Sequence, residues 1–127
     1  MIKVVAAIIR NNQNEIFIAQ RNQNKSQGGL WEFPGGKIEP NETENQAIIR
    51  EIKEELNMDI TVIDKYTEII YDYPDKTINL IALNCQMKDN HYTLLEHQDC
   101  AWTIQSNLNN YDFAPADKII VSKLTKI

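Results

Sequence analysis

The sequence predicts an α/β fold of the α+β kind, in which helices cover both faces of a mixed β-sheet to form an α/β/α sandwich. Several runs of continuous or alternating apolar residues are typical of strands. Two helical segments lie far apart in the chain, at residues 44–56 and 115–124. The chain has 127 residues, of which 43% are hydrophobic. This is enough for one domain, 1–127, with a core of its own.

The first quarter of the chain predicts strands. Residues 2–10 and 15–21 are apolar enough for two strands, joined by the polar turn 11–14. Residues 22–30 form a polar loop. A short strand near residues 31–33 then leads into a turn made by Gly35 and Gly36.

The segment 44–56 predicts an amphipathic helix with a clear beginning and end. Thr43 followed by Gln46 has the spacing of a capping box, and the segment contains no Gly or Pro. Apolar residues recur at Ile48, Ile52 and Leu56, which places them on one buried face. Asn57 follows this segment. Gly is the residue that most often ends a helix in the left-handed conformation, and Asn is the next most common.

The second half of the chain predicts two long strands, a short one and a closing helix. Residues 61–72 and 77–87 alternate as strands do and are separated by Pro74 and Asp75. Residues 88–99 are polar and predict a loop, and residues 100–104 predict a short strand. The helix over residues 115–124 begins with Pro115, a residue that favours the first helical position.

Composition limits the possible partners. The net charge of −5 argues against binding a nucleic acid polymer, although one nucleotide remains possible. Cys85 and Cys100 are predicted to be reduced thiols. The apolar run 4–9 is too short to span a membrane and lacks a cleavage region. We therefore expect a cytoplasmic protein without a membrane partner, either a monomer or a homodimer.

Three carboxylates share one patch of the predicted helix. Glu51, Glu54 and Glu55 are spaced i, i+3 and i+4 and border the apolar face. Like charges this close weaken a helix unless a cation neutralises them. Mg²⁺ prefers carboxylate oxygens, which suggests a magnesium site whose substrate brings phosphates. The alternative for such a run is an ordinary solvated face with Glu–Lys pairs.

The spacing around this helix resembles the Nudix box. Gly36 is followed after five residues by Glu42 and after seven more by Arg50-Glu51, and the box continues through Glu54-Glu55 to residues 57 and 58. Where the Nudix box has its last Gly, this sequence has Asn57. This difference affects helix termination rather than metal binding. Further segments resemble MutT and its relatives, namely residues 4–10, 15–21, 30–36, 71–75 and 113–117. A match of this length is highly specific.

The resemblance implies the Nudix fold and a hydrolase acting on a nucleoside diphosphate linked to another group. MutT-type enzymes convert nucleoside triphosphates to the monophosphate and pyrophosphate, and the best-known one removes 8-oxo-dGTP. A sister branch acts on CTP and modified pyrimidine deoxynucleotides. More distant alternatives are a nucleotide-sugar or dinucleoside polyphosphate hydrolase and a catalytically silent nucleotide-binding module. The Tyr73-Pro74 pair discriminates poorly among these, and the intact helix carboxylates argue against the silent module.

The resemblance also implies a set of catalytic and metal-binding residues. The cofactor is Mg²⁺, or Mn²⁺ in its place. The implied ligands are the Gly35 carbonyl, Glu51, Glu54, Glu55 and, in a mobile-looking polar stretch, Glu96; plain loop charge is the alternative for Glu96. The general base can be Glu51, Glu54 or Glu96. Arg50 is expected to orient a carboxylate rather than touch substrate. Glu42 is either an outer metal contact or an acid near a helix start.

A third group of residues is expected to bind the nucleotide. By resemblance Arg21 contacts phosphate, with Lys37 a weaker candidate. Phe33, Tyr73 and Ile78 can form an apolar slot for a base, although core packing is the alternative, above all for Ile78.

Asp117 occupies the position at which the 8-oxo-dGTP enzyme has Asn. An ionised Asp only accepts hydrogen bonds, which suits an amino group of cytosine or adenine. A carboxyl kept protonated by burial can also serve 8-oxoguanine. The alternative is that Asp117 stabilises the start of the last helix. His91 and His97 lack metal-ligand spacing and are predicted to lie on the surface.

Overall fold

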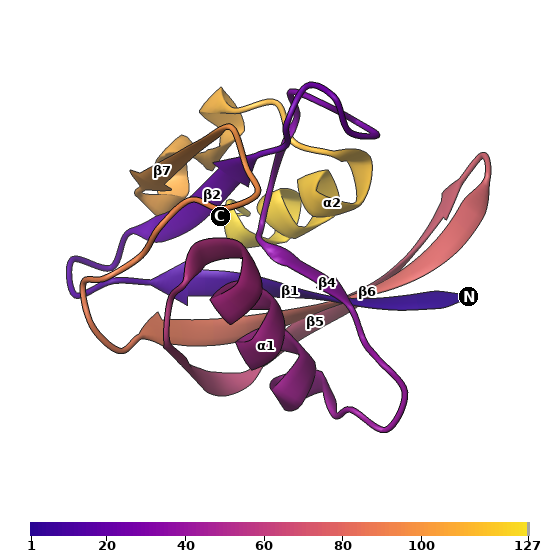
Figure 1. Ribbon diagram of the computed structural model, residues 1–127. Coiled ribbons are helices and arrows are strands. Elements are labelled where there is room, and N and C mark those ends of the chain that lie inside the picture. Colours follow the sequence, from indigo (N-terminus) through magenta and orange to yellow (C-terminus); the bar gives the residue numbers. More distant parts are fainter. Residues whose placement is uncertain (127) are drawn as a thin grey trace.

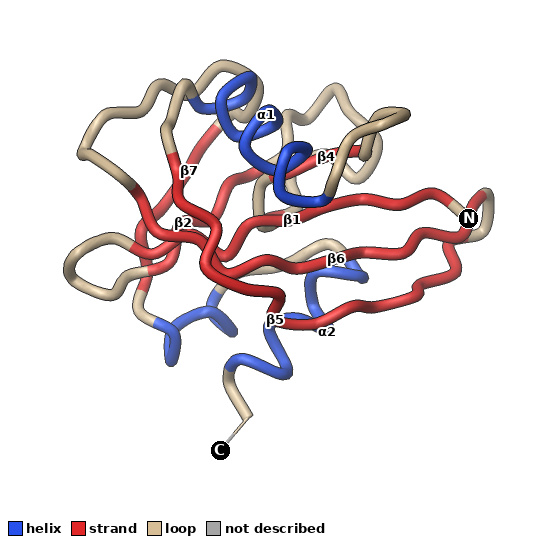
Figure 2. Tube along the Cα trace, turned by 90° about the horizontal axis from the view of Figure 1, so that it is seen from below, coloured by secondary structure: helices blue, strands red, loops and turns tan. Residues whose placement is uncertain are grey.

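A computed structural model describes residues 1–126 and shows an α/β/α sandwich (Figures 1 and 2). Helix α1 (Glu44–Leu56) covers one face of the sheet and helix α2 (Pro115–Leu124) covers the other. The predicted fold class and both helix ranges are confirmed. The predicted domain, 1–127, includes Ile127, which lies outside the described residues.

The sheet is mixed because β1 pairs in parallel with β6, whereas its other pairings are antiparallel. The path of the sheet runs β3-β2-β1-β6-β5, with β4 paired to β1 and β7 paired to β2. The strands are β1 (Ile2–Arg10), β2 (Ile16–Gln20), β3 (Trp31–Glu32), β4 (Gly35–Lys37), β5 (Ile60–Tyr73), β6 (Lys76–Met87) and β7 (Asp99–Thr103). The limits of the six strands predicted from the sequence differ from these by at most one residue at either end.

The central strand β1 is apolar on both sides because both of its faces are buried. Val5, Ala7 and Ile9 face the cluster under α1, and Ala6 and Ile8 face the cluster under α2. A strand buried on both faces shows a continuous apolar run rather than alternation. Its parallel pairing to β6 therefore follows the pattern expected of an interior strand.

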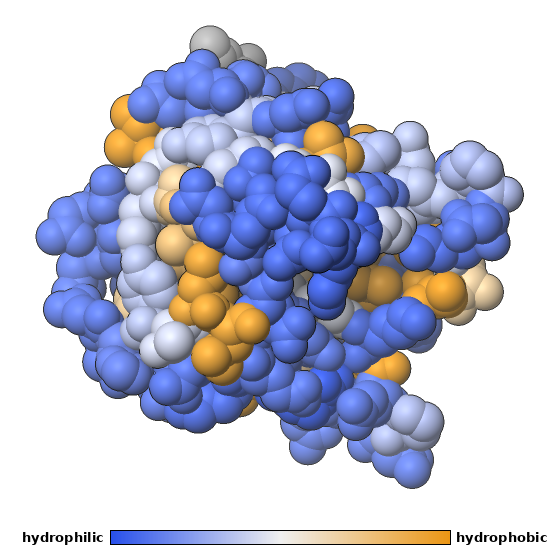
Figure 3. Space-filling model, turned by 45° about the horizontal axis from the view of Figure 1, so that its top comes forward, coloured by the Kyte–Doolittle hydropathy of each residue, from blue (hydrophilic) through white to orange (hydrophobic). Residues whose placement is uncertain are grey.

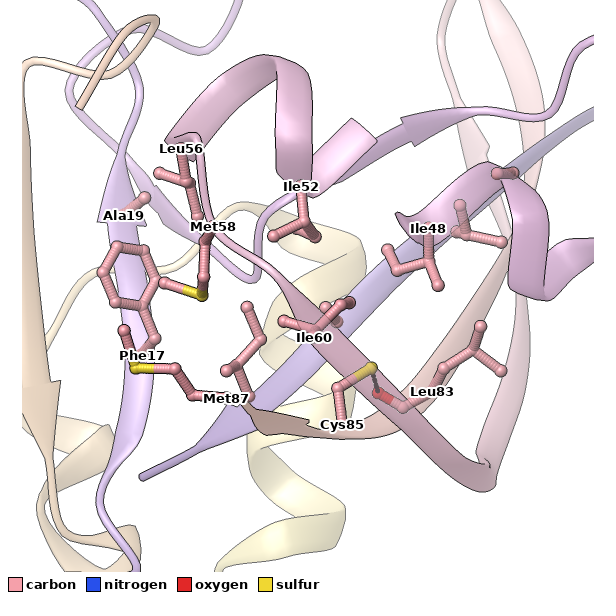
Figure 4. Packing of buried hydrophobic residues seen from close by; sticks show 14 of the residues in the cluster. Phe17, Ala19, Ile48, Ile52, Leu56, Met58, Ile60, Leu83, Cys85 and Met87 are labelled. Carbon is pink, nitrogen blue, oxygen red and sulfur yellow. Dashed lines mark hydrogen bonds between the residues drawn. The ribbon is translucent and has the colours of Figure 1, made fainter. Parts of the chain in front are cut away.

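The core under α1 carries the helix that bears the box carboxylates. Ile48, Ile52 and Leu56 point from α1 toward the sheet, where β2, β5 and β6 supply the facing side chains (Figure 4). All three are fully buried. Cys85 lies in this cluster, and burial raises the pKa of its thiol to about 12. Both Cys85 and Cys100 are free thiols, as predicted.

Helix α1 begins and ends as its sequence predicts. Gln46 N donates to Thr43 Oγ1 at 3.1 Å and Thr43 N donates to Gln46 Oε1 at 2.9 Å, which completes the capping box. Asn57 adopts the left-handed conformation (φ 49°), and its N–H donates to Lys53 O at 2.9 Å. These local bonds fix the residues at which the helix begins and ends.

Two elements differ from the prediction. Gly35–Lys37 is strand β4, paired with β1, and not only a turn. A Cβ on Gly35 would collide with the Val5 carbonyl oxygen, so the close pairing requires glycine although glycine is rare in strands. A 3₁₀ helix, Gln105–Asn110, also follows β7 and buries Leu108. Its polar sequence shows no helical periodicity.

The molecular surface is mostly hydrophilic on the face shown in Figure 3, with small separate groups of apolar residues. The hairpin of β5 and β6 extends beyond the rest of the sheet (Figure 1). Over residues 1–126, neither helix has the length and apolar character needed to cross a bilayer.

Candidate active site

Two cavities adjoin each other where α1, β3 and β4 meet. The first, of about 270 Å³, is strongly acidic and is lined by Arg21, Asn22, Lys25, Glu32, Gly35, Glu51, Glu54, Glu55, Glu96 and His97. The second, of about 200 Å³, is more apolar. Arg21, Glu32 and Gly35 line both cavities. Such a pair of spaces can hold one ligand with a charged end and an apolar end.

Helix α1 and strand β4 together place the carboxylates in the first cavity. The two elements lie side by side in Figure 1, with Gly36 of β4 facing Glu51 of α1. A Cβ on Gly36 would collide with the Glu51 carboxylate, so glycine leaves the space that this carboxylate occupies. The box glycine and the first box carboxylate are therefore a packing pair.

Arg50 is the centre of the acidic network. Its Nε donates to Glu42 Oε2 at 2.7 Å and its Nη2 donates to Glu42 Oε1 at 3.0 Å, a bidentate pair. Its Nη1 donates to Glu51 at 2.8 Å and to Glu54 at 3.1 Å. These bonds raise the pKa of Arg50 and lower the pKa of Glu42. Arg50 therefore orients the carboxylates of Glu51 and Glu54. Its own guanidinium is oriented by the bidentate pair with Glu42.

Glu55 is largely buried in the cleft, and its one ion-pair contact among the described residues is a long one, with His97 Nε2 at 4.0 Å. Burial is the main cause that raises the pKa of its carboxyl to about 10, followed by the neighbouring Glu51, Glu32 and Glu96. Its Oε1 is buried without a hydrogen-bond partner among residues 1–126. A bound cation would give this oxygen a partner and favour the ionised carboxylate.

The cleft fits a divalent ion in its chemistry. Its donors are carboxylate oxygens and a backbone carbonyl, the ligands that Mg²⁺ takes while keeping several waters. Over the described residues, no three acidic, His or Cys side chains converge tightly on one point. Arg50 accounts for part of this spread, since it draws Glu51 and Glu54 toward itself.

The polar stretch that contains Glu96 is anchored across the end of α1. Thr93 N donates to Leu56 O at 2.7 Å and Leu95 N donates to Glu55 O at 3.0 Å, so the loop satisfies carbonyls that the helix end leaves free. Glu96 reaches the acidic cavity, where its carboxylate pairs with Lys25 at 3.4 Å.

His97 also lies in this cleft, and the prediction that it is a surface residue was wrong. Its side chain is only 6% exposed, and its Nε2 lies 2.9 Å from Glu32 Oε2. The residues that cover the His97 side chain come from β3 and from the end of α1, and both elements are distant from His97 in sequence. His91, in contrast, is exposed as predicted.

The second cavity gathers the residues expected to hold a base. Phe33, Tyr73, Ile78 and Asp117 all line it, and Arg21 stands at its junction with the acidic cavity. Phe33 is stacked on Phe113 with ring centroids 5.4 Å apart, and Tyr73 Oη accepts a hydrogen bond from Ala116 N at 3.3 Å. The apolar wall is thus held by neighbours from α2 and the segment before it.

Asp117 connects this cavity to the start of α2. Its Oδ1 accepts a hydrogen bond from Phe33 N at 3.0 Å, and the residue lies in the first turn of α2. Burial, reinforced by the charge of Glu32, raises the pKa of Asp117 to about 8. The Asp117 carboxyl therefore favours its protonated form near neutral pH. Its place in the first turn of α2 is the position expected of an acidic residue at a helix start.

One predicted residue lies apart, and several others were missed. Lys37 is exposed on β4, outside the residues that line the two cavities; only its carbonyl joins the site, accepting a hydrogen bond from Arg50 Nη2 at 3.0 Å. The missed cleft residues are Asn22, Lys25, Glu32 and His97. Glu32 lies inside a segment that resembles MutT, which was a usable signal, whereas single polar residues in loops offered none.

Comparison with known proteins shows which family the chain is similar to. The NUDIX domain family model matches residues 5–123. The chain is 41% identical over 119 residues to the CTP pyrophosphohydrolase of Escherichia coli, covering 92% of this chain and 86% of that protein. It is 33% identical over 126 residues to the 8-oxo-dGTP diphosphatase of the same organism, covering 99% and 98%.

A solved structure is similar as well. The solution structure of the ORF135 protein of Escherichia coli superposes with a TM-score of 0.82 at 37% identity, covering 96% of this chain and 86% of that one. Members of the matched family generally use a divalent metal such as Mg²⁺. The extent of these matches and the complete set of box carboxylates lead to one conclusion: the chain belongs to the Nudix family of hydrolases.

Proposed function

We propose that the protein is a Mg²⁺-dependent nucleoside triphosphate pyrophosphohydrolase that releases a nucleoside monophosphate and pyrophosphate, with 8-oxo-dGTP as its principal substrate. The observation that carries the proposal is the junction of an acidic cleft and an apolar cavity at Arg21, Glu32 and Gly35. This arrangement suits a triphosphate on one side and a base on the other. Clearing oxidised nucleotides from the cytoplasmic pool is the corresponding cellular role.

The acidic cleft supplies the groups that would hold the metal. Glu51, Glu54, Glu55, Glu96 and the Gly35 carbonyl are the proposed ligands, with Mn²⁺ able to replace Mg²⁺. When bound, the ion neutralises phosphate charge and lowers the pKa of a coordinated water. The buried, unpartnered Glu55 Oε1 supports this assignment among the described residues.

The residues of the chain then divide the work of hydrolysis. Arg21 neutralises and orients phosphate at the junction of the two cavities. Glu54, the most exposed of the three helix carboxylates, is assigned as the general base. It takes a proton from water as the water oxygen bonds to phosphorus, and the phosphoanhydride bond breaks to release pyrophosphate. Arg50 acts indirectly, by fixing the Glu51 and Glu54 carboxylates.

Base recognition rests on the protonated carboxyl of Asp117. A protonated carboxyl presents one donor and one acceptor. It can donate to O6 of 8-oxoguanine and accept from N7–H. Unmodified guanine presents acceptors at both positions, so one of the two contacts would be lost.

The alternative substrate is CTP or a modified dCTP. Cytosine offers an N4 amino donor beside the N3 acceptor, which complements the same carboxyl. The similarity to a CTP pyrophosphohydrolase at 41% identity supports this second candidate. Asp117 therefore accommodates either base in its protonated form, and the two substrates must be separated by kinetics.

The deciding experiment compares kcat/KM with Mg²⁺ for 8-oxo-dGTP, dGTP, CTP and 5-methyl-dCTP, with monophosphate and pyrophosphate as the measured products. We expect 8-oxo-dGTP to be preferred over dGTP by about fivefold or more, since one hydrogen bond to the base corresponds to about 1 kcal/mol or more. A preference for the cytosine nucleotides would support the alternative. Release of inorganic phosphate from all four would contradict pyrophosphohydrolysis.

The pH dependence tests the role of Asp117. With a pKa of about 8, the Asp117 carboxyl is a donor below this pH and only an acceptor above it. We expect kcat/KM for the preferred nucleotide to fall by roughly tenfold between pH 7 and 9.5, since about one hydrogen bond is lost. The Asp117→Asn protein keeps a donor at every pH and should lack this decline.

Comparing the two proteins removes other pH effects, because the substrate and the metal ligands titrate in both. An equal decline in the wild-type and Asp117→Asn proteins would show that Asp117 is not the titrating group. A decline in neither protein would show that Asp117 does not ionise in the complex.

A further inference from the structure

His97 is a buried polar side chain to which the hydrolysis described above gives no role. Its Nε2 lies 2.9 Å from Glu32 Oε2 and 4.0 Å from Glu55 Oε1. Its Nδ1 is buried without a hydrogen-bond partner among residues 1–126. A carboxylate only accepts, so the bond to Glu32 requires the hydrogen on Nε2 of the ring.

Glu32 extends this contact to the phosphate side of the site. Its second oxygen, Oε1, accepts from Arg21 Nη1 at 3.0 Å. The Glu32 carboxylate thus joins the His97 ring to the Arg21 guanidinium, with one oxygen for each. Arg21 Nε also donates to Ser26 O at 2.8 Å, which fixes the other side of its planar group.

The backbone on both sides of His97 is held by separate elements. Leu95 N donates to the carbonyl of Glu55 in α1, and Gln98 N donates to the carbonyl of Gln20 in β2 at 3.1 Å. Gln20 immediately precedes Arg21. The backbone around His97 is therefore bonded on one side to the end of α1 that carries the proposed metal ligands, and on the other side to the end of β2, which Arg21 follows.

We propose that His97 is a positioning residue that sets Arg21 for phosphate through the carboxylate of Glu32. The proposal rests on the proposed function, because phosphate is the ligand that Arg21 is set to meet. Without the ring, Glu32 loses one of its two donors in a cleft crowded with carboxylates. Arg21 then loses the orientation of its only carboxylate partner within the described residues.

The kinetic test compares His97→Ala with His97→Gln. We expect His97→Ala to raise KM for the nucleotide roughly tenfold or more, with a smaller change in kcat, because Arg21 contacts phosphate in the ground state as well as in the transition state. Gln offers an amide donor at similar reach and should restore most of the affinity. A merely structural role would lower the active fraction and therefore kcat, and would leave KM unchanged.

A double-variant comparison shows whether His97 acts through Arg21. In the Arg21→Ala background, His97→Ala should add less than about a twofold effect, because contacts in one chain of partners are not additive. Multiplicative effects would overturn the proposal. His91→Ala is the matched control, since this exposed His lies outside both cavities and should keep wild-type KM.

A spectroscopic readout is independent of turnover. Long-range ¹H–¹⁵N spectra should show the His97 hydrogen on Nε2, and His97→Ala should shift or broaden the Arg21 Nε–H signal. A hydrogen on Nδ1 alone, or an unchanged Arg21 signal, would overturn the positioning role. A wild-type protein that hydrolyses no nucleotide would overturn the proposed function instead, and these spectra would still test the link from His97 to Arg21.

Discussion

Replacing Glu54 by Gln is expected to lower kcat by roughly 10²–10⁴-fold, the range associated with losing a general base. The amide cannot take a proton from water at neutral pH, and it removes one of the charges that attract Mg²⁺. Its exposed position means that the free energy of unfolding should change by less than about 0.5 kcal/mol. Pre-steady-state and steady-state hydrolysis at saturating Mg²⁺, with thermal unfolding in parallel, measure both quantities.

The same variant separates an enzyme from a module that only binds nucleotides. Calorimetry with a non-hydrolysable nucleotide and Mg²⁺ should show that Glu54→Gln still binds, with turnover lost. Glu44→Gln is the matched control, because Glu44 belongs to the same helix but pairs with Lys65, outside the cleft. Full activity of Glu54→Gln would show that the metal and base assignment is wrong.

The parts of the fold that are encoded locally were predictable. The limits of α1 follow from a capping box at Thr43 and a left-handed Asn57, which are bonds between residues three or four apart. Alternation along β5 and β6 predicts two strands because each side chain reports which face it occupies. The three box carboxylates share a face for the same reason, since helical spacing alone decides it.

The parts that depend on distant partners were not predictable. Strand β4 is made of residues that disfavour strands, and only its neighbour Val5 explains why Gly35 is required there. His97 is buried because β3 and α1 meet above it, a contact between residues 65 positions apart in the case of Glu32. The state of Asp117 likewise depends on Phe33 N and on burial by the surrounding core.

Replacing Arg50 by Met is expected to weaken both the fold and the reaction. The guanidinium joins Glu42, Glu51 and Glu54 in one network, and its side chain is 23% exposed. Without it, the partly buried Glu51 carboxylate loses its Arg50 donor, which should reduce the free energy of unfolding by about 1–3 kcal/mol. Among the described residues, Glu42 keeps only the backbone N–H of Glu39 as a donor. We expect kcat/KM to fall by roughly 10–100-fold, the effect typical of residues that orient metal ligands. Chemical denaturation and nucleotide hydrolysis measure the two effects.

Two further variants show whether geometry or charge is responsible. Arg50→Lys keeps the charge but cannot form the bidentate pair with Glu42 while also reaching Glu51. It should therefore recover part of the stability and little of the activity if orientation of the carboxylates is what matters. Lys53→Met controls for loss of a cation on the same helix. Among residues 1–126 the Lys53 ammonium pairs only with Asp59, on the surface and at 3.1 Å, so this change should cost less than about 1 kcal/mol. Full recovery of activity in Arg50→Lys would mean that Arg50 acts as a neutralising charge. Failure of Arg50→Lys to recover activity would instead assign Arg50 the task of orienting the Glu51 and Glu54 carboxylates through its planar group.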